Sequence, residues 1–213
     1  MLNFLCFMKT TVIKIGSGVI LTGRNKLDEF RIAHIAEQVA VLRKKGIRVV
    51  LIMSGAVACG ANYIQLLNGD IKLRKLAAGI GQAYLTSIVR KYFSAKNLTV
   101  AQILLTQENL NSPDNMPLKE TLEYYLEIGV VPIINENDVV ELNGFGGNDF
   151  LAAKIADLLG AERMVMLSTM EESGYGVGGG TVKKRVVAEL NEKGIKTSIV
   201  DGKEKNIIIN NIL

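Results

Sequence analysis

The chain has 213 residues, 48% of them hydrophobic and 22% charged, so it can bury an ordinary core without disulfides or a structural metal. Its two cysteines and single histidine exclude a disulfide scaffold and a zinc cluster of the usual Cys/His type, and this sparing use of cysteine favours a cytoplasmic protein. The net charge is +4, but both signs alternate along the chain and only 6% of the residues are aromatic, so we expect no nucleic-acid partner.

The first seven residues are apolar, but they carry no basic segment and no small-residue cleavage site, so they do not resemble a signal peptide. Met8 is a candidate for the true start. We therefore expect residues 1–7 to be a mis-annotated extension and residues 8–213 to form a single domain. No apolar run approaches the ~20 residues needed to cross a membrane, so no membrane partner is expected.

The apolar residues predict an alternation of strands and helices. A buried strand is a nearly continuous apolar run, whereas a helix carries apolar residues on one face at intervals of three and four. In chain order we expect a strand at 10–15, a helix from 32 that ends at Gly46, a strand at 47–53, a helix at 73–88, a strand at 98–105, a helix at 118–128, a strand at 130–134, a helix at 150–159, a strand at 164–167, a helix at 182–191, and strands at 197–200 and 207–209. This order predicts an α/β fold with a mainly parallel sheet and helices on both faces.

The first predicted strand contains a lysine and is followed by glycines. Ligands of open α/β sheets bind at the carboxyl ends of the strands, so polar residues at these ends are candidate site residues. Lys14 lies among apolar residues, where a buried lysine needs an anionic partner. Gly16 and Gly18 allow backbone N–H groups to approach a bound anion, which favours this interpretation over an edge-strand lysine that reaches solvent.

Ser54 and Gly55 follow the second predicted strand and open a further helix. Two interpretations stay open for Ser54. It is the N-cap of that helix, or its hydroxyl and the Gly55 N–H hold a ligand carboxylate or phosphate.

Four polar residues, Asn135-Glu136-Asn137-Asp138, follow the fourth predicted strand. A turn explains them, but two carboxylates at the end of a buried strand also suit an amine or magnesium. Asp149 precedes the helix expected at 150, where it either caps the helix or orients a lysine.

A glycine-rich loop at 174–180 leads into the helix expected at 182–191. Lys183 and Lys184 in its first turn oppose the helix dipole, so phosphate binding is favoured over a solvated pair. The loop contains G-x-G-x-x-G, but it follows the fifth strand rather than the first, which argues against a dinucleotide site. The pattern G-x-x-x-x-G-K-[ST] of P-loop enzymes is absent.

Together these motifs resemble the amino acid kinase family, and within it the branch that phosphorylates glutamate. The matching segments follow the family's order and lie at 12–19, 53–56, 78–82, 104–106, 131–138, 147–149 and 178–183. The resemblance implies a three-layer αβα sandwich and ATP-dependent phosphorylation of the glutamate side-chain carboxylate to glutamyl 5-phosphate, the first step of proline biosynthesis. ATP and Mg²⁺ are the cofactors that it implies.

The resemblance also implies roles for individual residues. Lys14 and Lys183 would neutralise charge on the transferring phosphoryl group, and Asp149 would hold both lysines. The glutamate-binding residues would be Ser54, Gly55, Asp138 and Asn148. The residues that bind ATP and its phosphates would be Lys14, Gly16, Gly18, Gly178, Gly179, Thr181 and Lys183. Relatives assemble through helix faces, so we expect a homo-oligomer, with 73–92 as a candidate surface.

Two departures from the family pattern define the alternatives. Gly147 stands where the family has an aspartate, which motivates a related kinase for another small carboxylate or phosphate acceptor. The nucleotide-binding segment after Leu167 is shortened, which motivates a degenerate kinase that acts as a binding module. We also expect a compact form without the C-terminal PUA domain of many relatives.

Overall fold

The computed structural model describes residues 9–64, 70–111, 115–169 and 180–213. Within these ranges six strands form one sheet in the order β3-β4-β2-β1-β5-β6, and every neighbouring pair is parallel. The strands are β1 Thr10–Ile15, β2 Arg48–Met53, β3 Val100–Leu105, β4 Val131–Glu136, β5 Arg163–Ser168 and β6 Lys196–Asp201. The predicted parallel α/β sheet is therefore confirmed. The expectation about residues 1–7 falls outside the described residues.

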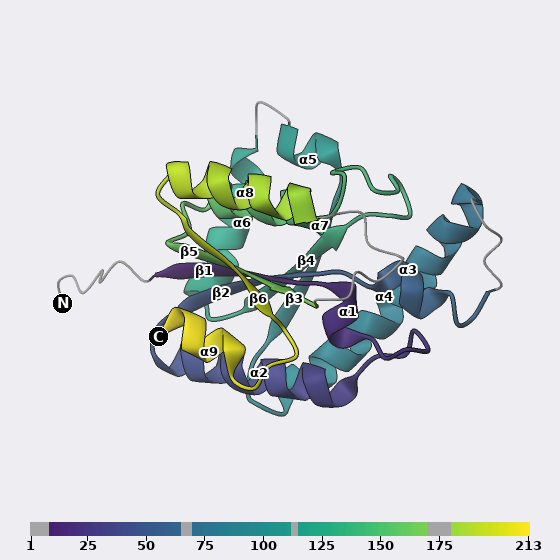
Figure 1. Cartoon of the computed structure of the whole chain (residues 1–213), viewed down its shortest axis with the longest axis horizontal. Coiled ribbons are helices and arrows are strands. Elements are labelled where there is room, and N and C mark those ends of the chain that lie inside the picture. The colour runs from purple at the N-terminus through teal and green to yellow at the C-terminus, as the bar shows by residue number, and fades with distance from the viewer. Residues whose placement is uncertain (1–8, 65–69, 112–114, 170–179) are drawn as a thin grey trace.

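Helices cover both faces of the sheet, which confirms the three-layer arrangement (Figure 1). One face carries α1 Ser17–Ile20, α2 Glu29–Lys44, α4 Ile71–Ser94 and α9 Ile207–Ile212, with α3 Ala56–Gly60 packed on α4. The other face carries α5 Gln107–Asn111, α6 Met116–Glu127, α7 Asn148–Leu158 and α8 Gly180–Glu192. Among the described residues, no helix combines the length and apolar character that a membrane crossing requires.

The sheet divides the core into two apolar layers because the residues of a strand alternate between its faces. Ile13 and Ile15 of β1 belong to the layer under α2, α4 and α9. Val12 belongs to the opposite layer, with side chains of α6, α7 and α8. Lys14 is two residues from Val12, so its side chain emerges on the face that α7 covers.

The prediction of a strand at 207–209 is wrong, because these residues begin helix α9. Asn206 adopts a left-handed conformation with φ of 57° and turns the chain onto α2. There the buried Gln38 side chain accepts hydrogen bonds from the backbone N–H groups of Ile208 at 2.9 Å and Ile209 at 3.3 Å. A run of three apolar residues does not distinguish a strand from a helix, and this distant glutamine decides the outcome.

Helices α3 and α4 touch backbone to backbone. A Cβ atom added to Gly81 of α4 would lie 1.8 Å from the carbonyl oxygen of Ala56, at the start of α3. A Cβ added to Gly60 of α3 would lie 1.8 Å from the carbonyl oxygen of Ala77. These two glycines set how closely the start of α3 lies against α4, and therefore where the chain emerges from β2.

We predict that Gly81→Ala lowers the free energy of unfolding by about 3 kcal/mol, because the helices must separate to admit the methyl group. Gly79→Ala is the matched control in the same helix. Its Cβ would lie 3.3 Å from Cγ2 of Val139, which is exposed and can move, so we expect a change within about 1 kcal/mol. Urea unfolding monitored by circular dichroism measures both variants, and equal losses would contradict the prediction.

Candidate active site

A lysine and an aspartate form a buried ion pair at the carboxyl ends of the strands. Lys14 Nζ lies 2.6 Å from Asp149 Oδ1, and the two side chains are only 9% and 4% exposed. β1 lies between β2 and β5, so it is not an edge strand from which the lysine reaches solvent. Asp149 lies in the first turn of α7, whose N-cap is Gly147, so Asp149 does not cap the helix.

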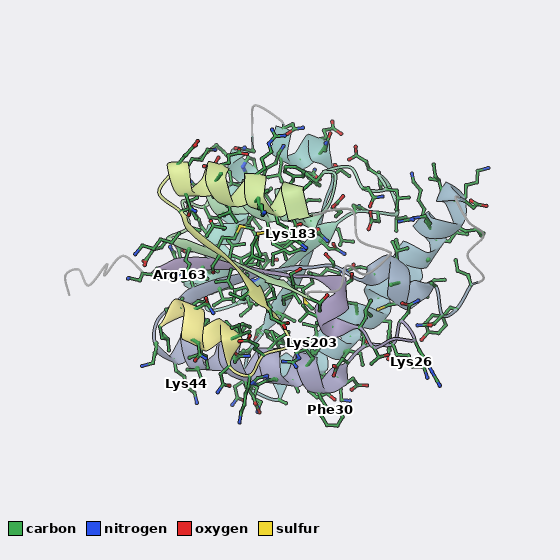
Figure 2. The ribbon with its side chains drawn as sticks, viewed as in Figure 1. Lys26, Phe30, Lys44, Arg163, Lys183 and Lys203 are labelled. Carbon is green, nitrogen blue, oxygen red and sulfur yellow. The ribbon has the colours of Figure 1, made fainter. Side chains whose placement is uncertain are left out.

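Lys183 lies on α8 and reaches toward the end of β5 (Figure 2). Its Nζ donates a hydrogen bond of 2.9 Å to Oγ of Ser168, the last residue of β5. Among the ion pairs of the described residues, Asp149 pairs with Lys14 and not with Lys183. The structure therefore places the two lysines at neighbouring strands of the sheet, each with its own partner.

The Gly16–Gly18 segment packs against the end of β5. The Gly16 N–H donates to the carbonyl oxygen of Leu167 at 3.0 Å. A Cβ added to Gly18 would lie 2.7 Å from Thr169 Oγ1, so a larger residue at this position would require the Thr169 side chain to shift. Of the other predicted phosphate-binding residues, Gly178 and Gly179 lie outside the described residues, and Thr181 belongs to α8 without a described side chain.

Four neutral polar side chains form a hydrogen-bonded network beside the ion pair. The amide of Asn148, on α7, donates to Ser54 Oγ at 2.8 Å and to Asn135 Oδ1 at 2.7 Å. Asn135 in turn donates to Gln82 Oε1 of α4 at 2.8 Å. The network joins the ends of β2 and β4 to two helices. Ser54 is not an N-cap, since Gly55 occupies that position with φ of 112°.

Within this network, Oδ1 of Asn148 is buried and has no hydrogen-bond partner among the described residues. A buried acceptor without a donor is unfavourable by about 1–3 kcal/mol. It is therefore available to a donor group of a ligand.

Asn135 and Glu136 are the last residues of β4, so the predicted turn begins later than the sequence suggested. Both are buried, and Glu136 accepts a hydrogen bond of 3.3 Å from the Phe145 N–H. Burial raises the pKa of Glu136 to about 7, and the carboxylates of Asp138 and Glu141 add to this increase. Glu136 therefore links the end of β4 to the loop before α7.

Asp138 lies beyond the end of β4 and accepts a hydrogen bond of 3.0 Å from the Asn143 N–H. Burial raises the pKa of Asp138, while this hydrogen bond and the charge of Arg74 oppose the increase. Within the described ranges, no group of three or more His, Cys, Asp or Glu side chains could hold a metal ion.

Sequence reasoning gave no role to Gln82 or Ser168, and it considered Asn135 and Glu136 only as part of the polar run after the fourth predicted strand, whose two carboxylates suit an amine or magnesium. Each lies at the end of an apolar run or on the buried face of a helix, where a polar side chain needs a partner. Polar residues at such positions are the signal that identifies them.

A family model described as the amino acid kinase family matches residues 9–172. The chain belongs to the amino acid kinase family. It is 34% identical to a glutamate 5-kinase of Clostridium acetobutylicum, over 90% of this chain and 74% of that protein. It is 41% identical to a glutamate 5-kinase of Thermus thermophilus, over 76% of this chain and 45% of that protein. The chain thus spans between about half and three quarters of the length of these relatives.

Solved structures share the fold at low sequence identity. An isopentenyl phosphate kinase of T. acidophilum superposes with a TM-score of 0.68 and 15% identity, over 95% of each chain. A UMP kinase from Ureaplasma parvum superposes with a TM-score of 0.64 and 13% identity, over 96% of this chain and 95% of that one. These two structures support the amino acid kinase fold for this chain.

We predict that Glu136→Gln removes a pH dependence of stability. The native state holds a proton on Glu136 between the ordinary pKa of 4.5 and the raised value of about 7, so wild-type stability falls as pH rises through this window. Glutamine keeps an acceptor for the Phe145 N–H but does not titrate. We expect the unfolding free energy of the variant, relative to wild type, to rise by up to ~1.4 kcal/mol per pH unit within the window.

Urea unfolding at a series of pH values measures this difference. Glu127→Gln removes an exposed glutamate at the end of α6 and serves as the matched control. A difference between Glu136→Gln and wild type that stays constant with pH would contradict the prediction.

Proposed function

We propose that the protein transfers the γ-phosphoryl group of ATP to the side-chain carboxylate of glutamate and forms glutamyl 5-phosphate, the first intermediate toward proline. A carboxylate oxygen of glutamate forms a bond to phosphorus, the bond to the ADP oxygen breaks, and ADP leaves. The observation that carries this proposal is the buried Lys14–Asp149 pair at the carboxyl ends of the strands, with Lys183 held at the end of the adjacent β5.

Phosphoryl transfer depends on positioning and on the stabilisation of charge rather than on covalent help from the protein. Lys14 and Lys183 supply positive charge to the transferring group, and Asp149 fixes the position of the Lys14 ammonium. The acceptor is already ionised, so the reaction needs no strong general base. Mg²⁺ would enter with ATP as part of the substrate and would neutralise part of the charge of its phosphates.

Glutamate would bind at the neutral network beside this pair. The unpartnered Asn148 oxygen and the Asp138 carboxylate would accept hydrogen bonds from its ammonium group. The Ser54 hydroxyl and the Gly55 N–H would donate to a carboxylate of the substrate. The relatives from Clostridium acetobutylicum and Thermus thermophilus are glutamate 5-kinases, which supports this acceptor.

We predict that the wild-type protein forms γ-glutamyl hydroxamate when ATP, Mg²⁺, glutamate and hydroxylamine are present. Lys14→Ala and Lys183→Ala should each reduce the rate by 10²-fold or more, about the effect of deleting a transition-state donor. Lys184→Ala is the matched control. The sequence pattern grouped Lys184 with Lys183 as phosphate-binding, but Lys184 is exposed on α8, so its variant should keep wild-type activity.

Circular dichroism establishes that each variant is folded. If the folded wild type forms no hydroxamate, glutamate is not the acceptor. Calorimetry with MgATP then separates a kinase for another acceptor, which binds the nucleotide, from a binding module, which does not.

We also propose that the protein is cytoplasmic and that it forms a homo-oligomer. Leu76 and Ile80 on α4 are 59% and 40% exposed, and Val139 and Val140 of the adjoining loop are 49% and 62% exposed. Lys75 Nζ donates to the carbonyl oxygen of Val140, so helix and loop present one apolar surface.

We predict that the double variant Leu76→Ser and Ile80→Ser dissociates the oligomer, because both substitutions remove apolar side chains from this surface. Light scattering measures the molar mass in solution, and an unchanged mass would exclude this surface.

A further inference from the structure

The segment after β1 has little stability of its own. α1 comprises the four residues Ser17–Ile20, without a side-chain cap at its N-terminus. A single helical turn contributes almost no intrinsic stability, because nucleation fixes several residues for each hydrogen bond formed. The position of Gly16-Ser17-Gly18 therefore depends on contacts from distant parts of the chain.

One such contact comes from residues 202–206, which join β6 to α9 and which we call the C-terminal turn. Nζ of Lys203 donates a hydrogen bond of 2.9 Å to the carbonyl oxygen of Val19. The carbonyl groups at the end of a helix lack intrahelical partners, and a lysine is favourable there. The same ammonium lies 3.8 Å from Oδ2 of Asp28, which is the N-cap residue of α2. Lys203 thus lies between α1 and the start of α2 (Figure 2).

The C-terminal turn is itself anchored on α2. The Arg31 guanidinium donates to the carbonyl oxygens of Lys203 at 2.7 Å and Glu204 at 3.3 Å. The Arg31 N–H donates to Asp28 Oδ1 at 3.0 Å. Lys203 therefore extends from a turn whose backbone is fixed, so its ammonium is held at α1.

The C-terminal turn also contacts Ser168, the residue that accepts a hydrogen bond from Lys183. The Gly202 N–H donates to the carbonyl oxygen of Ser168 at 2.8 Å, and Ser168 Oγ accepts from Lys183. A Cβ added to Gly202 would lie 2.6 Å from Val19 Cγ2, so the turn packs directly on α1. The C-terminal turn is thus bonded both to the segment that follows Lys14 and to the residue that holds Lys183.

We propose that Lys203 is a positioning residue for phosphoryl transfer, which fixes the Gly16–Gly18 segment where the phosphates of ATP bind. The inference rests on the proposed function for the identity of the reaction. The contacts of the Lys203 ammonium are with the Val19 carbonyl oxygen and Asp28 Oδ2. Lys203 acts through the Val19 carbonyl, so its loss should affect the use of ATP and not the binding of glutamate.

The test compares Lys203→Met, which removes the donor, with Lys203→Arg, which keeps one. Lys205→Met is the matched control, because Lys205 is exposed on the same turn. In the hydroxamate assay we expect Lys203→Met to raise KM for ATP roughly tenfold, while KM for glutamate changes less than twofold. Deuterium exchange of residues 16–21 should increase in Lys203→Met, and Lys203→Arg should restore both readouts.

Two results overturn the inference. The first is a Lys203→Met variant that matches Lys205→Met in exchange at residues 16–21 or in KM for ATP. The second is an equal rise in KM for both substrates together with a lower melting temperature, which is general loosening of the fold. If the wild type forms no hydroxamate, the proposed function fails, and exchange at residues 16–21 still decides whether Lys203 positions this segment.

Discussion

An ammonium and a carboxylate buried together at the carboxyl ends of the strands constrain the rest of the structure. Either charge alone would be unfavourable in this position, because removing one partner leaves the other as an uncompensated buried charge. Lys14 is fixed by the central strand β1, so α7 must begin where Asp149 can reach it. Gly147 makes this possible, since its φ of 115° turns the chain into α7. The direction of α7 over the sheet follows from this one pair.

The surroundings of the pair are polar but largely neutral. Ser54, Gln82, Asn135 and Asn148 are hydrogen-bonded to one another through amide and hydroxyl groups, which avoids the desolvation of further charges and leaves Asn148 Oδ1 without a partner among the described residues. Glu136 adds a carboxyl group whose raised pKa keeps it partly protonated near neutrality. A site of this kind holds polar groups in fixed directions and leaves the charge balance to the lysines and the ligand.

The sheet was largely predictable from the sequence, because buried parallel strands are continuous apolar runs and helices have a different period. The sequence also marked Lys14 and Asp149, since charged residues beside apolar runs need partners. It missed the extent of β4, because Asn135 and Glu136 are polar residues inside a strand. It gave no sign of α9 or of the Lys203 contact with Val19, because both depend on residues far apart in the chain.

The order of strands across the sheet has a consequence for synthesis on the ribosome. β1 is made first, but it is central, and one of its two neighbours, β5, is made late. A nascent chain that ends before α7 exposes one side of β1, with Lys14 hydrated because Asp149 does not yet exist. Domains fold in the direction of their synthesis, but here the N-terminal half cannot complete its own core. The Lys14 ammonium therefore leaves water only when the second half of the chain has been made.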